Sequence, residues 1–124
     1  MTPTTKRTGR THVVKHWPKY HRSVVSGETT SQLRKDDRDY QIGDEMLMRE
    51  YNSELDIYTG STCRVLITDA LRGIEGLMPG YCLLSTFIGP DATRHNPSIA
   101  GKSAREIEDA EKNNPRVSEQ GKSV

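Results

Sequence analysis

Large apolar side chains are confined to the middle of this chain, and that confinement limits the size of any hydrophobic core. Residues 1 to 11 and 89 to 124 carry almost none, so a core must come from roughly 75 to 80 residues between these ends. That is enough for one small domain. We therefore expect a flexible basic arm at 1–10, one domain at 11–89 and a polar tail at 90–124 that adds little to stability.

The net charge of +1 hides an uneven distribution of charged residues along the chain. Residues 1–22 contain six basic residues and no acidic one, whereas residues 23–88 contain six basic and eleven acidic residues. The basic arm suits contact with a phosphate backbone, but the acidic body would repel one. This distribution argues against a strong nucleic-acid binder that ignores sequence.

The two cysteines, Cys63 and Cys82, lie in apolar stretches and lack the close spacing of a metal-binding or redox pair. They are expected to be small buried hydrophobic residues in a reducing compartment. No signal peptide and no apolar run long enough to cross a membrane is visible. We therefore expect a soluble protein of the cytoplasm that does not contact a membrane.

The first elements of the domain are a short strand and a short helix. Thr11–Lys15 has the composition of a strand, and Pro18 favours a helix start because its missing N–H has no partner in the first turn. Gly27 suits the left-handed residue that follows a helix. The helix is expected to pack one face on the sheet, formed by Trp17, Tyr20, His21, Val24 and Val25.

After Gly27 the pattern changes to strands and turns. Strands are expected at Thr29–Lys35, Glu45–Tyr51, Thr62–Thr68 and Gly80–Ile88, with a long hairpin connection at Asn52–Ser61. In the polar tail, Ser103 and Glu106 match a capping box ahead of a helix at 103–112 with a thin apolar stripe. Such a helix would be weakly docked, disordered or completed by a partner, and we expect disorder.

The segment RKDDRD, from Arg34 to Asp39, is the densest cluster of opposite charges in the chain. Neighbouring opposite charges tend to pair, so Asp37 and Asp39 are expected to hold Arg34 or Arg38 in place before the Gly43-Asp44 corner. No phosphate-binding loop, nucleophile elbow or metal-ligand motif accompanies them. The sequence therefore predicts no cofactor, no metal site and no catalytic residue.

A family resemblance rests on four blocks of sequence in order. They are HVVKHWPKYHRSVVSG after residue 11, the RK-x-DRDY-x-IGD block, YTG at Tyr58–Gly60 and GL-x-x-GY at Gly76–Tyr81. These blocks resemble a family of unknown function within the ASCH domains, part of the PUA-like superfamily, found in phages and bacteria. The resemblance implies an α+β, mostly β, PUA-like (ASCH) pseudo-barrel with one or two short helices packed outside.

The same resemblance implies binding of RNA or a nucleotide beside the first helix, without catalysis. ASCH domains have a motif whose four positions here are Gly27, Thr29, Gln32 and Arg34, so Gly and Arg are kept while the usual Lys and acid are absent. Amidohydrolases that resemble this family use a Lys at the position of Thr29, which carries no amine. The expected nucleic-acid-binding residues are Lys15, Trp17, Gly27, Thr29, Gln32, Arg34, Lys35, Arg38 and Tyr40.

Two other functions stay open from the sequence. The chain could instead be an effector that binds a host protein through its acidic surface or its tails. The third reading is a small amidohydrolase acting on modified nucleosides. The acidic body favours the protein partner, whereas the basic arm and the arginines near the first helix favour single-stranded RNA.

Overall fold

The computed structural model of the chain describes residues 9–112. Most of the basic arm expected at 1–10 therefore lies outside the described residues. The elements follow in the order β1 (Thr11–His16), α1 (Pro18–Val25), β2 (Ser31–Lys35), β3 (Glu45–Asn52), β4 (Ile57–Leu71), β5 (Tyr81–His95) and α2 (Ala104–Lys112). No helix in this described part of the chain is long and apolar enough to span a membrane.

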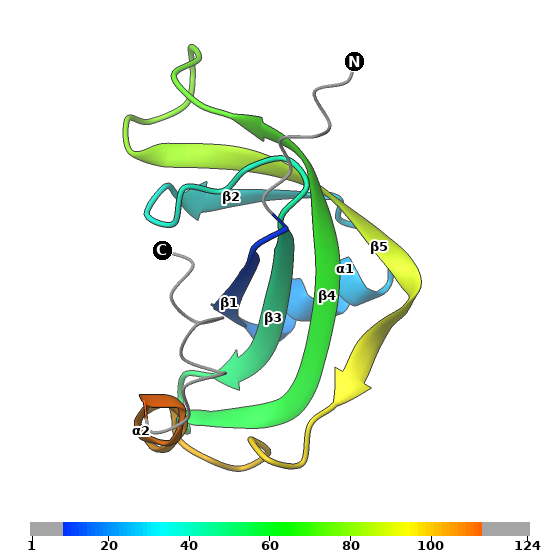
Figure 1. Cartoon of the computed structure of the whole chain (residues 1–124), viewed down its shortest axis with the longest axis vertical. Coiled ribbons are helices and arrows are strands. Elements are labelled where there is room, and N and C mark those ends of the chain that lie inside the picture. The colour runs from blue at the N-terminus through cyan, green and yellow to red at the C-terminus, as the bar shows by residue number, and fades with distance from the viewer. Residues whose placement is uncertain (1–8, 113–124) are drawn as a thin grey trace.

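All five strands of residues 9–112 form one sheet in the order β1-β3-β4-β5-β2. β1 pairs with β3 in parallel, and the other three pairings are antiparallel. The chain leaves β1, forms α1, pairs β2 at the far edge of the sheet and then returns to β3 (Figure 1). The two edges of the sheet, β1 and β2, are therefore joined by α1 and the turn that follows it.

The sheet curls into a half-barrel because its two longest strands are bent (Figure 1). β4 and β5 have 15 residues each, and their pairing shifts register at Cys63/Val65 and at Ile67/Asp69. Such bulges increase the local twist and bend the strands. Pro90, which has no N–H for a ladder bond, lies in β5 near the first shift. The predicted α+β, mostly β, pseudo-barrel with short external helices is confirmed.

The strands are longer than the sequence pattern indicates. β4 begins at Ile57, inside the segment expected to be a connection, so the hairpin loop spans only residues 53–56. β5 continues to His95, beyond the domain end expected at residue 89. The β5 extension is mostly polar and exposed, and the β4 extension contains Thr59, Gly60 and Ser61, so a search for apolar runs detects neither.

The main core lies on the inner side of the curl. It contains Met46 and Met48 from β3, Val65 and Ile67 from β4 and Leu84 from β5, all at most 2% exposed. Helix α1 adds Val24 to this core. Cys63 and Cys82 are buried there and are not disulfide-bonded, and burial raises the pKa of the Cys63 thiol to about 11.

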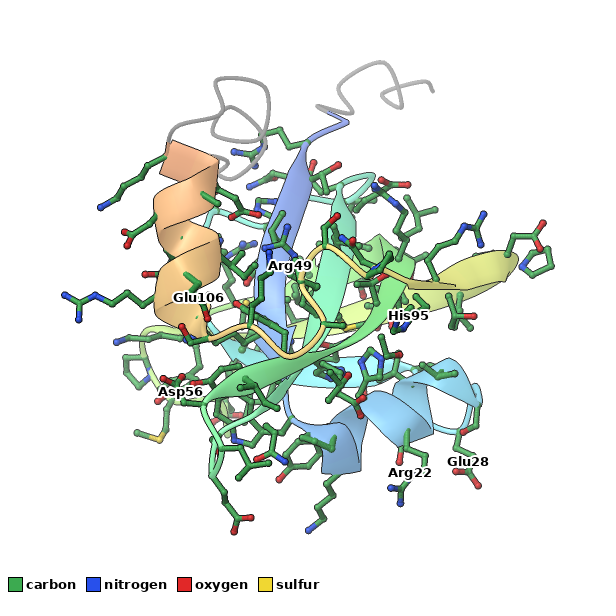
Figure 2. All side chains as sticks on the ribbon, turned by 90° about the horizontal axis from the view of Figure 1, so that it is seen from below. Arg22, Glu28, Arg49, Asp56, His95 and Glu106 are labelled. Carbon is green, nitrogen blue, oxygen red and sulfur yellow. The ribbon has the colours of Figure 1, made fainter. Side chains whose placement is uncertain are left out.

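Helix α2 packs on the sheet, contrary to the expected disorder. Ala104 and Ile107 of α2 are buried in a second apolar cluster with Tyr51, Tyr58 and Ile99. The capping box forms as the sequence predicts, with reciprocal hydrogen bonds between Ser103 and Glu106 of 3.0 and 3.1 Å. Figure 2 shows α2 lying beside the sheet, with Arg49 between the helix and the strands.

A buried polar contact strengthens this docking. Arg49 Nη2 donates to Glu111 Oε2 at 2.6 Å, although the two residues are 62 positions apart. Arg49 is itself buried, because the register shift between Arg49 and Tyr51 turns both side chains away from solvent. The polar tail therefore contributes apolar and charged contacts that its composition alone does not indicate.

The corner at Gly43-Asp44 joins the charged segment to β3. The fully buried Asp44 Oδ2 accepts hydrogen bonds from the Gln41 N–H at 3.1 Å and from Arg10 Nη2 at 3.2 Å, and it lies 2.8 Å from His12 Nε2. Gly43 has a φ of 95°, which favours glycine, and its N–H donates to Ile67 O. The corner thus fixes the starts of β1 and β3 to each other.

Replacing Ile107 by Ala should lower the free energy of unfolding by about 2 kcal/mol, because it leaves a cavity in the cluster that docks α2. Urea unfolding followed by circular dichroism measures the change. Arg105→Ala is the matched control, since Arg105 is exposed on the same helix. Equal stability of the two variants would show that α2 does not dock.

Asp44→Asn should destabilise the fold by about 3 kcal/mol, because it removes the negative charge that Arg10 and His12 share inside the protein. Thermal and urea unfolding provide the measurement. Asp39→Asn is the control, since the Asp39 side chain is 71% exposed and its carboxylate lies 3.7 Å from Arg10. A variant of Asp44 that unfolds like the control would contradict the assigned role of this corner.

Candidate functional site

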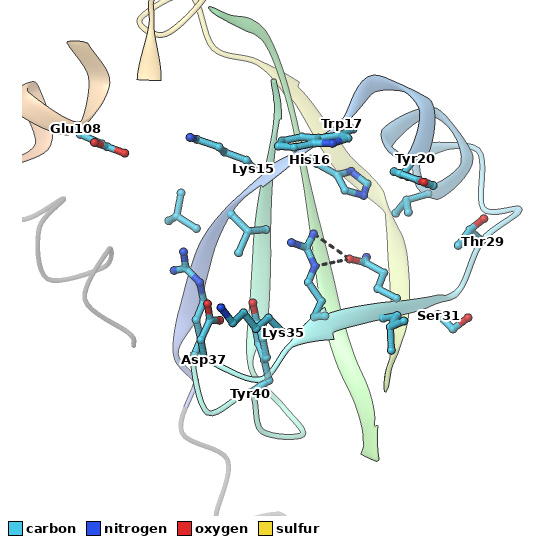
Figure 3. Close-up of a pocket in the computed structure, with 17 residues that line it drawn as sticks. Lys15, His16, Trp17, Tyr20, Thr29, Ser31, Lys35, Asp37, Tyr40 and Glu108 are labelled. Carbon is cyan, nitrogen blue, oxygen red and sulfur yellow. Dashed lines mark hydrogen bonds between the residues drawn. The ribbon is translucent and has the colours of Figure 1, made fainter. Parts of the chain in front are cut away.

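A cavity of about 850 Å³ lies between the two edge strands of the half-barrel. β1 and β2 do not pair with each other, so the curled sheet stays open along this seam. Helix α1 covers one side of the opening, and Asp37, Arg38 and Tyr40 line the other side. Figure 3 shows the two strands facing each other, with Trp17 and Tyr20 near α1 and Glu108 of α2 across the opening.

The cavity brings together eight of the nine residues that the sequence predicts as a site. They are Lys15, Trp17, Thr29, Gln32, Arg34, Lys35, Arg38 and Tyr40. Gly27 does not line the cavity. It follows α1 with a φ of +83°, where a side chain would be strained, so its role is to turn the chain from the helix toward β2. His16 and Glu108 also line the cavity, and the sequence did not predict them.

The cavity is positively charged although the body of the protein is acidic. Lys15, Arg34, Lys35 and Arg38 line it against only two carboxylates, Asp37 and Glu108. The excess of two positive charges is concentrated in one concave region, where low-dielectric walls strengthen the field. The structure thus separates the charges that are interleaved in the sequence.

The ion pairs of the charged segment differ from those expected. Asp36 accepts from Arg72 Nε at 2.6 Å, and Asp39 lies 3.7 Å from Arg10. Within residues 9–112, neither Arg34 nor Arg38 has a carboxylate within ion-pairing distance. The expected ion pairs of Asp37 and Asp39 with these arginines do not form in this part of the chain, because Asp39 turns toward Arg10. Asp37 lines the cavity and acts on Arg34 only beyond ion-pairing distance.

Two contacts from Arg72 hold this segment against the end of β4. Besides its pair with Asp36, Arg72 Nη2 donates to the Tyr40 carbonyl oxygen at 2.6 Å. Tyr40 is consequently buried in the core, 1% exposed, with its ring 4.7 Å from that of His12. Tyr40 forms part of the cavity floor and is too buried to offer a ring face for stacking.

Arg34 is held by a neutral side chain. Its Nε and Nη2 both donate to Gln32 Oε1, at 3.2 and 3.1 Å, shown as dashed lines in Figure 3. Gln32 Nε2 in turn lies 3.3 Å from Met48 Sδ. Residues 32 and 34 share a face of β2, which is why these side chains meet. Burial lowers the pKa of the Arg34 guanidinium, as expected for a cation that has lost water.

The bond to Gln32 determines which part of the guanidinium remains available. It occupies the edge formed by Nε and Nη2, so the Nη1 protons and the second Nη2 proton have no hydrogen-bond partner in the described part of the chain. These protons form the end-on fork that matches two oxygens of a carboxylate or phosphate. Arg34 is thus oriented but not neutralised.

Two aromatic side chains stand at the mouth of the cavity. Trp17 and Tyr20 are 45% and 57% exposed, so they do not pack α1 onto the barrel as expected. The buried residues of α1 are His21 and Val24 instead. Trp17 contacts Tyr51 with ring centroids 5.6 Å apart, and Lys15 Nζ lies 4.6 Å from the Tyr51 ring centroid. The Trp17 ring is thereby supported on one side and accessible on the other.

A chain of three polar side chains runs from the cavity wall into the barrel. His16 Nδ1 lies 3.0 Å from His21 Nδ1, and His21 Nε2 lies 3.2 Å from Ser61 Oγ. Burial lowers the pKa of His16 to about 4, with Arg34 and His21 contributing, and burial also lowers the pKa of His21 against the opposing effect of Glu50. Both rings are therefore neutral at pH 7.

The alternation of buried and less buried residues along the first strand is the sequence signal that would have identified His16. In THVVKH the buried residues are His12, Val14 and His16, so one face of β1 carries both histidines. The two rings serve different purposes, since His12 contacts Asp44 and His16 contacts His21. Across residues 9–112, no group of three or more His, Cys, Asp or Glu side chains is placed to hold a metal ion.

A family model and a phage protein both match this chain. Residues 11–86 match the model of a domain of unknown function, DUF3850, which covers the whole cavity except Glu108. The chain is also similar to an uncharacterized 12.9 kDa protein in the GpA 3′ region of Escherichia phage P2, with 31% identity over 78 residues, 63% of this chain and 69% of that protein. The chain therefore belongs to the DUF3850 family.

Proposed function

We propose that this protein is a non-enzymatic binding module of the PUA-like (ASCH) type that holds a nucleotide of single-stranded RNA in the cavity between β1 and β2. The observation that carries the proposal is Arg34, a largely buried cation with a neutral partner and a fork of N–H donors left over. A buried cation normally has a carboxylate partner, because an uncompensated charge costs free energy. A bound anion would supply the missing charge.

The oxygens of a phosphate suit Arg34 best. The guanidinium is planar, and its end-on fork can donate two parallel hydrogen bonds to one phosphate group. Because Gln32 already fixes the side chain, little further rotamer entropy is lost when the phosphate binds. Arg34 is largely buried, and the lower dielectric around it strengthens each charge-assisted bond.

The aromatic residues at the mouth provide a platform for a base. Every base has a flat π-face, and stacking on an exposed aromatic ring is worth about 1–3 kcal/mol. Trp17 offers such a face, supported from behind by Tyr51, and Tyr20 lies one helical turn away. The rim cations Lys15, Lys35 and Arg38 can then contact neighbouring phosphates of the same strand.

The volume of the cavity fits this mode of binding. At about 850 Å³ it lies in the range of sites for small organic ligands, and it is too short for an extended run of nucleotides. A single nucleotide with its flanking phosphates would fill it. The family blocks do not define the ligand, so support for RNA over DNA comes from the ASCH resemblance at Gly27 and Arg34, with Gly27 just after α1 and Arg34 in the cavity.

Arg34→Gln should weaken binding of a fluorescein-labelled octauridine by about tenfold or more, because charge-assisted hydrogen bonds contribute about 1.5–3 kcal/mol. Anisotropy titrations at several salt concentrations should give a slope of log affinity against log salt of about −2 for the natural protein, as expected for about three phosphate contacts. The variant should lose about 0.7 of that slope. The single tryptophan, Trp17, gives an independent readout through quenching of its fluorescence.

Arg22→Gln is the matched control, since Arg22 is exposed on α1 and does not line the cavity. It should change neither the affinity nor the salt slope by a measurable amount. A deoxyuridine octamer of the same length tests the preference for RNA. Equal losses for the two variants would contradict binding in the cavity, and no binding to any oligonucleotide at low salt would overturn the proposal.

A second candidate function, binding of another protein, is favoured by one observation. Leu33 of β2, Leu83 of β5 and Leu71 of β4 are register partners in a row across three strands. Leu33 is 63% exposed and Leu71 is 38% exposed, which is unusual for a row of leucines. If the oligonucleotide titrations fail, this row is the surface on which a protein partner should be sought by Leu33→Ser and Leu71→Ser variants.

A further inference from the structure

His16 occupies the end of β1, where its ring forms part of the cavity wall. It is 5% exposed and shares the inward face of the strand with His12 and Val14. Its Nδ1 lies 3.0 Å from His21 Nδ1, whereas its Nε2 has no hydrogen-bond partner in the described part of the chain. A ring that is fixed at one nitrogen and unpartnered at the other, beside a cavity, is arranged to contact a ligand.

The contact between the two Nδ1 atoms requires one donor and one acceptor. If His16 donates, then His16 Nε2 carries a lone pair and His21 Nε2 donates to Ser61 Oγ. If His21 donates, then His16 Nε2 carries a proton and the Ser61 hydroxyl donates to His21. A serine hydroxyl can fill either role, so this chain lets His16 Nε2 act as a donor or as an acceptor without movement of the rings.

The charged groups around His16 are identifiable on each neighbouring element. Arg34 from β2 and His21 from α1 both oppose a positive charge on His16, and burial opposes it further. The negative charge of Glu50 from β3 raises the pKa of His21, against the effect of burial. Glu50 also accepts a hydrogen bond from Thr59 of β4 at 2.7 Å. Asp37 and Glu108 line the same cavity. Burial is the largest of the effects that keep His16 neutral, and the charge of Arg34 is the next largest.

We propose that His16 is a second ligand-contacting residue, that its Nε2 hydrogen-bonds the phosphate held by Arg34, and that ligand binding is accompanied by uptake of a proton at His16. This inference rests on the proposed function, because it requires a phosphate at Arg34. The phosphate offsets the charge of Arg34 and adds a negative charge beside His16. Both changes favour the imidazolium, which donates from both ring nitrogens while His21 Nδ1 accepts.

The sign of the pH effect follows directly. In the free protein His16 has a pKa of about 4, and in the complex its pKa is raised. Between these two values the complex binds more protons than the free protein, so affinity increases as pH falls through the pKa of the complex toward 4. A phosphodiester ligand keeps its single charge over this range, so the ligand does not contribute to the effect.

The test is a titration of the dinucleotide UpU between pH 4.5 and 7.5, followed by Trp17 fluorescence. The natural protein should bind more tightly as pH falls, by up to about tenfold per pH unit at the steepest point, the limit for one proton. His16→Gln should remove the part of this dependence due to His16 and weaken binding below pH 6. Calorimetry in two buffers of different ionisation enthalpy counts the protons taken up.

His95→Gln is the matched control, because His95 is an exposed histidine that does not line the cavity. It should follow the pH profile of the natural protein. Protonation of Asp37 and Glu108 also increases anion affinity at low pH, but these residues remain in His16→Gln, so the difference between the two profiles isolates His16. If His16→Gln does not fold, the imidazole nitrogen signals of His16 in the natural protein, with and without UpU, decide the same question.

The outcomes separate this inference from the proposed function. Binding that depends on Arg34 but has the same pH profile in His16→Gln and in the natural protein overturns the role of His16 and leaves the proposed function standing. Absence of UpU binding at every pH, with octauridine binding intact, likewise overturns the contact with His16. Absence of binding to both ligands overturns the proposed function, and this inference with it.

Discussion

The Asp44 carboxylate, fully buried at the start of β3, meets Arg10, His12 and the backbone of Gln41 within 3.2 Å. Parallel strands cannot be joined by a tight turn, so the alignment of β1 with β3 needs a contact of another kind. Asp44 provides that contact, because it accepts from Arg10 just before β1 and from the Gln41 N–H just before β3, and it lies 2.8 Å from His12 Nε2. Burying a carboxylate without partners would cost free energy. The strand register brings the three partners to Asp44, and their contacts with Asp44 in turn hold that register.

The contacts around this corner also determine which charged side chains line the cavity. Arg10 engages Asp39 and Asp44, and Arg72 engages Asp36, so two of the three acids of the charged segment are directed into scaffolding. The segment is thereby fixed with Tyr40 in the core and Arg38 at the cavity. The basic side chains of this nearly neutral segment are left to face the opening between β1 and β2. Separation of charge by the fold, and not overall composition, produces the positive cavity.

Local features of the structure could be predicted from the sequence, and long-range ones could not. The start of α1 at Pro18, its end before Gly27 and the capping box of α2 depend on contacts within a few residues. The docking of α2 depends on Tyr51 and Tyr58 meeting Ile107, which a thin apolar stripe in an isolated helix does not indicate. The ion pairs were mispredicted for the same reason, since Asp36 and its partner Arg72 are 36 positions apart.

The arrangement around Arg34 is hard to explain as scaffolding. The chain has 17 acidic residues, and it places carboxylates against Arg10, Arg49, Arg64 and Arg72, but gives Arg34 an amide. A carboxylate in place of Gln32 would satisfy the guanidinium more strongly and would also repel an incoming anion. An amide oxygen orients the guanidinium through two hydrogen bonds without neutralising it, and Asp37 acts on it only beyond ion-pairing distance. Under the proposed function, the gain from that choice comes from an anion bound in the cavity, which would supply the counterion that the Arg34 guanidinium otherwise lacks.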